Sequence, residues 1–423
     1  MNALALSLAY LRRRPLNTVL NLLLLAIGVG TISLLLLFSD QLQERLARDA
    51  QGVDMAVGAK GSPMQLILSS VFHIDVPTGN VRIADARPLT ENRMIEQVIP
   101  LALGDSFRGF RIVGTERAYA DNYGAELARG AWWQASMEAT VGSVAAAQAG
   151  LGVGTSFVGS HGLAEGGAMH GEHHYRVVGV MAPTGTVLDR VILVSVESVW
   201  DVHEIHHGGE AEGEDHDAHE SAAGSAGDGS RESASVLETG DDDLELTALL
   251  VRFRNPIGAA TMPRQINMTT PMQAALPGYE IARLMQMIGI GLDGFRAFAA
   301  VLVVSAGLGI FTALYNALAQ RRYDIAVMRS LGASRGAILR QILLEGTLLA
   351  FAGGLLGLIL GHAVAEVAGA WLWREHQIYL RGLAWDADEG WLAVMALLLG
   401  AVAALLPALQ AYRIDISRVL ARG

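Results

Sequence analysis

The sequence predicts an integral membrane α-helical protein with four transmembrane helices and a large mixed α/β extracytoplasmic domain inserted between the first and the second. Four apolar stretches are each long enough to cross a bilayer, and arginines gather beside them at three places. Apolar residues make up 52% of the chain although its formal net charge is −11. This combination indicates that apolar and acidic segments are separate along the chain.

The spans follow from length and hydropathy. A helix needs about 20 apolar residues to cross a hydrocarbon core about 30 Å thick, and its centre is expected to be uncharged. The predicted spans are residues 16–38, 297–319, 338–367 and 391–411. The first is longer than the apolar core of a signal peptide and runs on into polar helical sequence. We therefore expect it to stay as an anchor.

Arginine predicts the orientation. Arginines precede the first span, fill the link between the second and third, and follow the fourth, and the positive-inside rule places all three segments in the cytoplasm. We expect a multi-pass protein of the bacterial inner membrane with both termini cytoplasmic. The segments outside the spans are an amphipathic N-terminus (1–15), the periplasmic insertion (39–296), a cytoplasmic helix and turn (320–337), an outer loop (368–390) and a cytoplasmic tail (412–423).

The insertion has two kinds of sequence. Short β-type runs alternate with Gly- and Pro-marked turns, and helical patterns at both ends predict stalks that continue into the spans. The runs that predict strands are residues 107–115, 175–183, 189–196 and 244–255. Residues 208–243 contain Gly, Ser, Ala, His and acidic residues with almost no large apolar side chain. Such a tract is expected to be disordered because it cannot bury enough surface.

Composition excludes several classes of site. There is no cysteine, so the chain has no disulfide and no thiolate ligand or nucleophile. A P-loop requires Gly-Lys-Ser/Thr, but Lys60 is the only lysine and glycine follows it, so these residues hold no P-loop of that type. The acidic balance also argues against nucleic acid as a partner.

The link between the second and third spans is the most informative stretch. Its spacing predicts a short amphipathic helix that Gly332 ends, with Ser334 as N-cap of the next helix. Apolar side chains on one face would fill a partner's groove while arginines orient it; the alternative is a helix lying on anionic lipid. The residues assigned to this contact are Arg321, Arg322, Tyr323, Asp324, Ile325, Met328, Arg329, Leu331, Gly332, Ala333 and Ser334.

This link carries a family resemblance. The FtsX-like permeases, the family of MacB and the lipoprotein-releasing permeases of type VII ABC systems, share the signature R-x-x-E-I-x-x-L-R-x-L-G-A-S/T, which RRYDIAVMRSLGAS resembles. The beginning LAYLRRRPLNTVLNLLLLAIGVG, the long insertion and the ending PALQAYRIDISRVL are also similar to that family. Asp324 stands where Glu is usual, and Ile416 stands where Pro is usual. VVGVMAPTGTVLDRVILVS is similar to unfused permeases encoded with a separate ATPase.

The resemblance implies the permease subunit of an ABC transporter, which is not itself an enzyme. A cytoplasmic ATPase dimer would bind ATP and Mg²⁺ and contact residues 321–334, and a second permease copy or a paralogue would complete the complex. By resemblance, ATP hydrolysis would move the periplasmic domain (mechanotransmission) to act on a lipoprotein, a peptide or a hydrophobic compound. A periplasmic substrate-binding protein or lipoprotein partner, and membrane lipid, would be further contacts.

Histidines suggest an alternative, a permease that handles zinc or another divalent metal. Nine of the twelve lie between residues 161 and 219 among acidic residues, and such tracts often bind metal, although an incidental solubilising loop is equally compatible. The candidate ligands are His170, His173, His174, His203, His206, His207, His216 and His219.

Two smaller patterns complete the candidates. His203-Glu204-x-x-His207 matches the H-E-x-x-H pattern of zinc peptidases, but Gly208 and Gly209 would end such a helix at once. His362 and Glu366 lie four residues apart near the outer end of the third span and share a helix face. An intramembrane pair of this kind suggests a metal or proton path, or a simple paired role near the interface.

Overall fold

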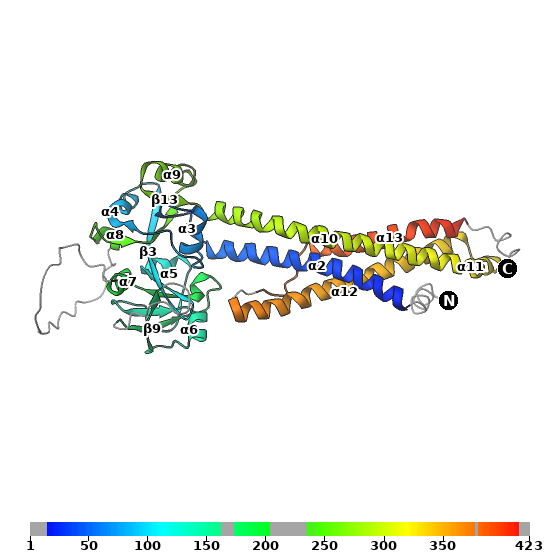
Figure 1. Ribbon diagram of the computed structural model, residues 1–423, viewed down its shortest axis with the longest axis horizontal. Helices are drawn as coiled ribbons and strands as arrows, with labels where there is room; N and C mark the ends of the chain where they lie inside the picture. The colour runs from blue at the N-terminus through cyan, green and yellow to red at the C-terminus, as the bar shows by residue number, and fades with distance from the viewer. Residues whose placement is uncertain (1–14, 162–172, 204–234, 240, 377–379, 414–423) are drawn as a thin grey trace, which may run out of the picture. The chain divides into compact units, whose positions relative to one another are not determined.

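A computed structural model describes residues 15–161, 173–203, 235–239, 241–376 and 380–413. The chain forms two compact units (Figure 1). The helical unit comprises residues 1–44 and 285–423, and the α/β domain comprises residues 45–284. The insertion predicted between the first two spans is therefore a separate folded unit, as expected.

The helical unit is built on four long helices. Each is long and apolar enough to cross a membrane, which confirms the predicted number of spans within the described residues. They are α2 (Pro15–Asp49), α10 (Pro277–Gln320), α12 (Arg335–His376) and α13 (Glu389–Tyr412), with the short α11 (Arg322–Ser330) between α10 and α12. Both α2 and α10 extend into the α/β domain, so the helical stalks predicted at the ends of the insertion are present.

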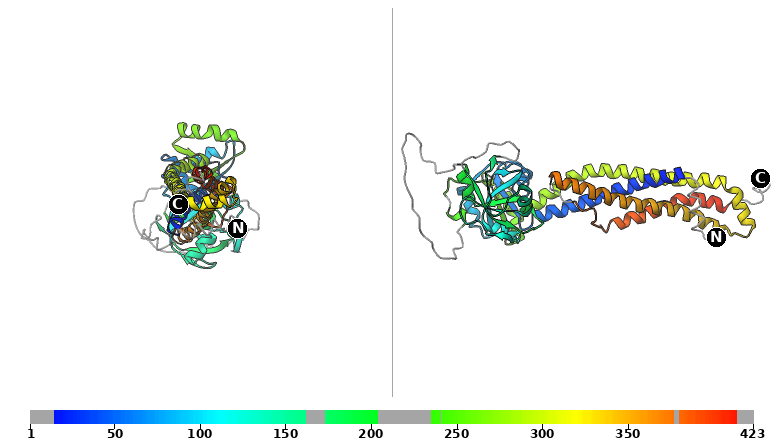
Figure 2. Two further views of the ribbon diagram at one scale, coloured as in Figure 1. Left: turned by 90° about the vertical axis from the view of Figure 1, so that its right-hand side faces the viewer. Right: turned by 90° about the horizontal axis from the view of Figure 1, so that it is seen from below.

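The four helices pack along a common apolar core (Figure 2). Leu25, Ile310, Leu349 and Ala404, one from each helix, are all buried in it. Small residues allow α2 and α12 to approach closely: a Cβ atom placed on Gly357 would lie 2.7 Å from the Val29 Cβ atom. Glycines at this contact therefore serve close helix packing, as expected for membrane helices.

The α/β domain is built around a mixed sheet of 11 strands among the described residues, in the order β13-β1-β12-β3-β4-β10-β6-β9-β5, with β7 on β9 and β8 on β3; β11 and β2 pair separately. The pairs β4–β10 and β6–β9 are parallel and the other pairs are antiparallel. The strands are β1 (Met55–Ala59), β2 (Val81–Arg82), β3 (Ile95–Phe107), β4 (Phe110–Thr115), β5 (Leu127–Gly130), β6 (Glu138–Val141), β7 (Ser156–Phe157), β8 (Ser160–His161), β9 (Tyr175–Met181), β10 (Val191–Val194), β11 (Glu245–Leu246), β12 (Ala248–Phe253) and β13 (Met272–Ala275).

Short helices cover this sheet, and local sequence explains where several begin. Ser62 and Asn255 accept backbone N–H bonds as N-caps, and a proline follows each at the first helical position. The helices are α3 (Pro63–Ser70), α4 (Ile83–Ala86), α5 (Arg117–Asn122), α6 (Ser143–Ala149), α7 (Val196–Val202), α8 (Val236–Thr239) and α9 (Pro256–Thr269), with 3-10 turns at Arg87–Leu89 and Val187–Arg190. All four strands predicted from the sequence are present as β4, β9, β10 and β12.

One predicted boundary is wrong. The tract expected to be disordered extends to residue 243, but its last part folds: α8 buries Leu237 completely, and the backbone N–H of Val236 donates to Glu116. Arg87 holds the same segment through an ion pair with Asp242. Two apolar side chains, Val236 and Leu237, were enough to dock a sequence of otherwise polar composition. Residues 208–234 lie outside the described part of the chain.

Candidate functional site

The residues from Arg321 to Ser334, which we call the α11 link, form a tight helical hairpin between α10 and α12. The backbone of Arg321 leaves the helical conformation and so separates α10 from α11. After α11, Gly332 takes a φ of 102°, which only glycine adopts without strain. The Ser334 Oγ atom then accepts a bond from the Ala337 N–H at 3.2 Å, so both predicted caps are confirmed.

The apolar face of α11 packs on the chain itself. Ile325 is 5% exposed and packs with Leu318, Ile338 and Ala411 from α10, α12 and α13, and Met328 packs against the same cluster while partly buried. This differs from the prediction that Ile325 and Met328 fill a partner's groove. Packing these side chains against the rest of the chain removes their apolar surface from water even when no partner is bound. The contacts fix α11 to α10, α12 and α13.

Arg321 has a structural partner that the sequence reading missed. Its Nη1 atom lies 3.4 Å from the Glu345 Oε2 atom in α12, and both side chains are largely buried. The pair borders a cavity of about 570 Å³ whose other walls are mostly apolar. Glu345 is an acidic residue within an apolar span, and a charged side chain at such a place was the available signal. Arg321 therefore ties the end of α10 to α12.

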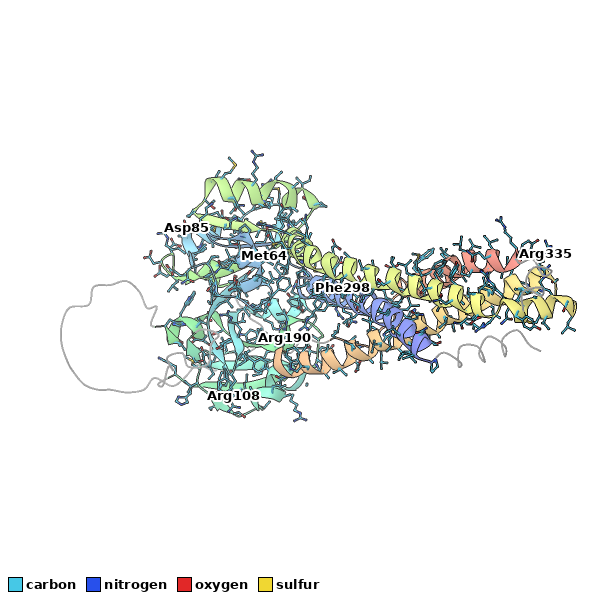
Figure 3. All side chains as sticks on the ribbon, turned by 45° about the vertical axis from the view of Figure 1, so that its right-hand side comes forward. Met64, Asp85, Arg108, Arg190, Phe298 and Arg335 are labelled. Atoms are coloured by element: carbon cyan, nitrogen blue, oxygen red, sulfur yellow. The ribbon has the colours of Figure 1, made fainter. Side chains whose placement is uncertain are left out.

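The opposite face of the α11 link is open. Arg322 and Tyr323 are exposed on α11, and Leu331 in the turn is 83% exposed. Arg335 lies at the start of α12 (labelled in Figure 3). Its guanidinium carbon is 5.8 Å from the centre of the Tyr412 ring of α13. The remaining predicted residues are Gly332 and Ser334, which are exposed, Arg329 and Ala333, which are partly buried, and Asp324, whose side chain lies outside the described part.

A polar cluster lies near the other end of the helical unit. The predicted pair His362 and Glu366 does not bond to itself: His362 Nδ1 contacts the Gly382 carbonyl oxygen, and Glu366 accepts from the Gly382 N–H at 2.9 Å. His362 Nε2 instead faces Glu389 at 3.2 Å, and Ser33 Oγ donates to Glu389. Sequence reasoning missed Ser33 and Glu389, because nothing in the sequence indicates that residues 356 positions apart meet.

The candidate metal histidines are only partly described. His173 and His174 precede β9, His203 follows α7, and the described residues hold no group of three His, Asp or Glu side chains arranged to bind a metal ion. The others lie outside the described residues: His170, His206, His207, His216 and His219. His203 faces Asp105 with 3.5 Å between Nε2 and Oδ1, and donation from the imidazole to this carboxylate raises the pKa of His203.

The first residue of the H-E-x-x-H pattern, His203, does not lie within a helix. Helix α7 ends at Val202, and His203 caps it with its N–H bonded to the Val199 and Trp200 carbonyl groups. Its imidazole is directed at Asp105. Glu204 lies outside the described residues. Among the described residues, His203 therefore packs beside Gly104 of β3 and pairs with Asp105.

Comparison with known families decides the identity of the chain. Residues 296–416 match the FtsX-like permease C-terminal domain, and residues 18–234 match the MacB-like periplasmic core domain. The second match alone covers more than half of the 423 residues. The chain belongs to the FtsX-like, MacB-type family of ABC transporter permeases. The periplasmic-domain match begins within α2 and covers the α/β domain of the permease as far as residue 234, so α8, β11, β12, α9 and β13 lie beyond it. The other match begins within α10 and continues through α11, α12 and α13.

Individual relatives match over shorter segments. The permease is 35% identical over 127 residues to the macrolide export ATP-binding/permease protein MacB of Nitrobacter winogradskyi, which is 30% of this chain and 19% of that protein. It is 28% identical over 124 residues to the uncharacterized ABC transporter permease YknZ of Bacillus subtilis, 28% of each chain. The periplasmic region of MacB from Actinobacillus actinomycetemcomitans aligns over 57% of this chain and 95% of that structure at 12% identity, with a TM-score of 0.32. The family assignment rests on the family matches.

Proposed function

We propose that this permease binds a separate cytoplasmic ATPase dimer through the open face of the α11 link and passes the motion of the ATPase to its own α/β domain. The observation that carries the proposal is the division of the α11 link into two faces. Ile325 anchors one face within the chain, whereas Arg322, Tyr323 and Leu331 leave the other face exposed. Arginine and tyrosine are enriched at the energetic centres of protein interfaces, and the exposed leucine adds apolar area that a partner can bury.

Transmission through the molecule follows from the anchored face. A push on α11 acts on α10, α12 and α13 through the buried contacts of Ile325, and on α10 and α12 through the Arg321–Glu345 ion pair. Helix α10 has 44 residues, so it is about 66 Å long at 1.5 Å per residue, and its first turns belong to the α/β domain. A continuous helix of this kind is a stiff connection, and α2 is a second one.

The proposal also covers the location of the protein and the class of its substrate. Arg321, Arg322, Arg329 and Arg340 lie in and beside the α11 link, which supports a cytoplasmic position for this end of the helices. We propose an inner-membrane protein whose α/β domain acts in the periplasm, together with a second permease copy or a paralogue. Its substrate would be an envelope molecule such as a lipoprotein, a peptide or a hydrophobic compound, because the family match assigns a periplasmic core domain to the unit that moves.

The test is to change the open face alone. Arg322→Glu and Leu331→Asp are expected to weaken ATPase binding at least tenfold, since loss of a central interface residue costs about 2 kcal/mol or more. The measurement is co-purification of the ATPase with the detergent-solubilised permease, together with the ATPase rate. Neither substitution removes a contact that anchors α11, unlike a change at Arg321.

The matched control is Arg264→Glu, a charge reversal on the exposed side of α9 in the α/β domain. It is expected to leave co-purification unchanged. Wild-type co-purification and activity in both Arg322→Glu and Leu331→Asp would contradict the proposal.

A further inference from the structure

The cavity beside the Arg321–Glu345 ion pair has walls from three helices and does not include the exposed residues of the proposed ATPase contact. Its volume of about 570 Å³ falls within the range of about 300–1,000 Å³ that is typical of small-ligand sites. Leu314 of α10, Met328 of α11 and Ile342 of α12 line it, and most of the other lining side chains are also apolar. We call this space the three-helix cavity. Its lining favours a ligand that is mainly hydrocarbon.

The three-helix cavity lies at the ends of two membrane-spanning helices. Its wall in α10 belongs to the last turns of one span, and its wall in α12 belongs to the first turns of another. The cavity is not sealed, so the medium that surrounds the spans can enter it. At this level the medium includes lipid, and apolar walls give water few hydrogen-bond partners. An acyl chain of the bilayer therefore meets a space that matches its chemistry.

Arg340 supplies a positive charge at the edge of the three-helix cavity. Its side chain lines the cavity and is also exposed, and it has neither an ion-pair partner nor a hydrogen-bond partner among the described residues. Arg335, the preceding arginine in α12, instead lies near the Tyr412 ring. A guanidinium group pairs well with phosphate, and basic pockets between membrane helices bind acidic lipid headgroups. The walls of the cavity thus suit hydrocarbon, and its edge suits an anion.

We propose that the three-helix cavity binds one acyl chain of an anionic phospholipid, with the headgroup phosphate paired to Arg340. The hydrocarbon chain covers apolar walls that the helices leave open, and the phosphate neutralises the arginine. A chain in this position touches α10, α11 and α12 together, so the lipid braces the α11 link against two membrane spans. The inference concerns the permease alone and does not depend on the ATPase contact.

The carboxylate of Glu345 does not oppose an anion at Arg340. Glu345 pairs with Arg321 at 3.4 Å, and both side chains are largely buried, so the pair adds little net charge. Gln341, another polar lining residue, is uncharged. Within the described part of the chain, Arg340 is therefore the one charged lining residue that the chain itself does not neutralise. A zwitterionic lipid brings its own cation to this edge and should bind less well.

The test uses the full-length permease without the ATPase, in nanodiscs of phosphatidylcholine. Each preparation contains a trace of phosphatidylglycerol or phosphatidylcholine with the same photoreactive acyl chain, and mass spectrometry of peptides locates the labelled residues. Phe298, which is 60% exposed on α10, reports ordinary contact with the surrounding lipid. Relative to Phe298, phosphatidylglycerol should label Leu314, Met328 and Ile342 about fivefold more than phosphatidylcholine does, the preference expected from one arginine beside an anionic headgroup.

Two results of this experiment would overturn the inference. One is equal labelling of the three-helix cavity by both lipids, which would remove the role of the anionic headgroup. The other is a cavity without label, because another part of the chain or a second copy fills it.

Substitutions separate the cavity from the charge. Arg340→Gln should lower phosphatidylglycerol labelling of the cavity to the phosphatidylcholine level and leave labelling of Phe298 unchanged. Ala337→Phe places a large side chain at a lining position, so it should lower labelling by both lipids. The matched control is Arg413→Gln, at an exposed arginine that follows α13 and does not line the cavity, and it should label like the wild type. Wild-type labelling of the cavity in either Arg340→Gln or Ala337→Phe would overturn the inference.

Discussion

At the scale of single residues, the pKa values of two histidines of the α/β domain are shifted in opposite directions. Burial, together with nearby Arg111, lowers the pKa of His73 to about 3, and its ring contacts the Ser69 carbonyl oxygen and the Tyr119 hydroxyl. His203 has a raised pKa because it contacts Asp105. As the pH falls below about 6.5, His73 destabilises the fold because only the unfolded chain gains its proton, whereas His203 stabilises it.

The contribution of His203 gives a pH-dependent prediction. Because its folded pKa is raised, the stability it provides is fully present below the unfolded pKa of about 6.5 and is lost as the pH rises through the folded value. His203→Gln should therefore be less stable than wild type at pH 5.5, by about 0.5–1 kcal/mol for a partly exposed ion pair, and equal to it at pH 9.

Thermal unfolding of the α/β domain within the full-length protein in detergent measures this difference. Comparing variant with wild type at each pH cancels the effect of His73. A difference that stays constant from pH 5.5 to 9 would show that His203 acts through packing alone.

At the scale of elements, the close contact between α2 and α12 depends on glycines, which have no side chain to hold the helices apart. A Cβ atom on Gly357 would lie 2.9 Å from the Ala26 carbonyl oxygen and 2.7 Å from the Val29 Cβ atom, so α2 would have to shift. Gly357→Ala should destabilise the helical unit by about 1–3 kcal/mol through overpacking. The measurement is thermal unfolding in detergent.

Gly289 provides a matched control because it also lies inside a long helix, α10, and has no atom within 4 Å of an added Cβ atom. Gly289→Ala should be neutral or stabilising by about 0.5–1 kcal/mol, since alanine favours a helix over glycine. Equal effects of the two substitutions would argue against close packing of α2 on α12.

At the scale of the whole molecule, the sequence predicted what is encoded locally. Hydropathy located four spans, and the Gly332 and Ser334 caps were readable because each acts on its immediate neighbours. Strand order was not predictable, because β1 pairs with β12 and β13, which lie about 190 residues or more away in the sequence. Such pairing depends on how the whole core packs and not on local sequence. The Arg321–Glu345 and Ser33–Glu389 contacts were missed for the same reason.

Composition was a poor guide where a few apolar residues act inside a polar tract. Val236 and Leu237 dock α8 on the domain within a segment expected to be disordered. Amphipathicity was also ambiguous in α11, because an apolar helix face can serve a partner or the chain itself. The structure assigns Ile325 to the chain and leaves Leu331 exposed. A periodic pattern reports that a face is apolar and does not report what covers it.

We propose above all that the α11 link passes ATPase motion through the helical unit to the α/β domain, with a change in the separation of α10 and α12. The most direct measurement is the distance between spin labels on Phe298→Cys in α10 and Val367→Cys in α12, both at exposed positions, with the ATPase bound. We expect the distance distribution to change between nucleotide-free and ATP-bound states, and to stay unchanged when Arg322→Glu is added. An ATP-dependent shift that persists in Arg322→Glu, or no shift in the wild-type complex, would contradict the claim.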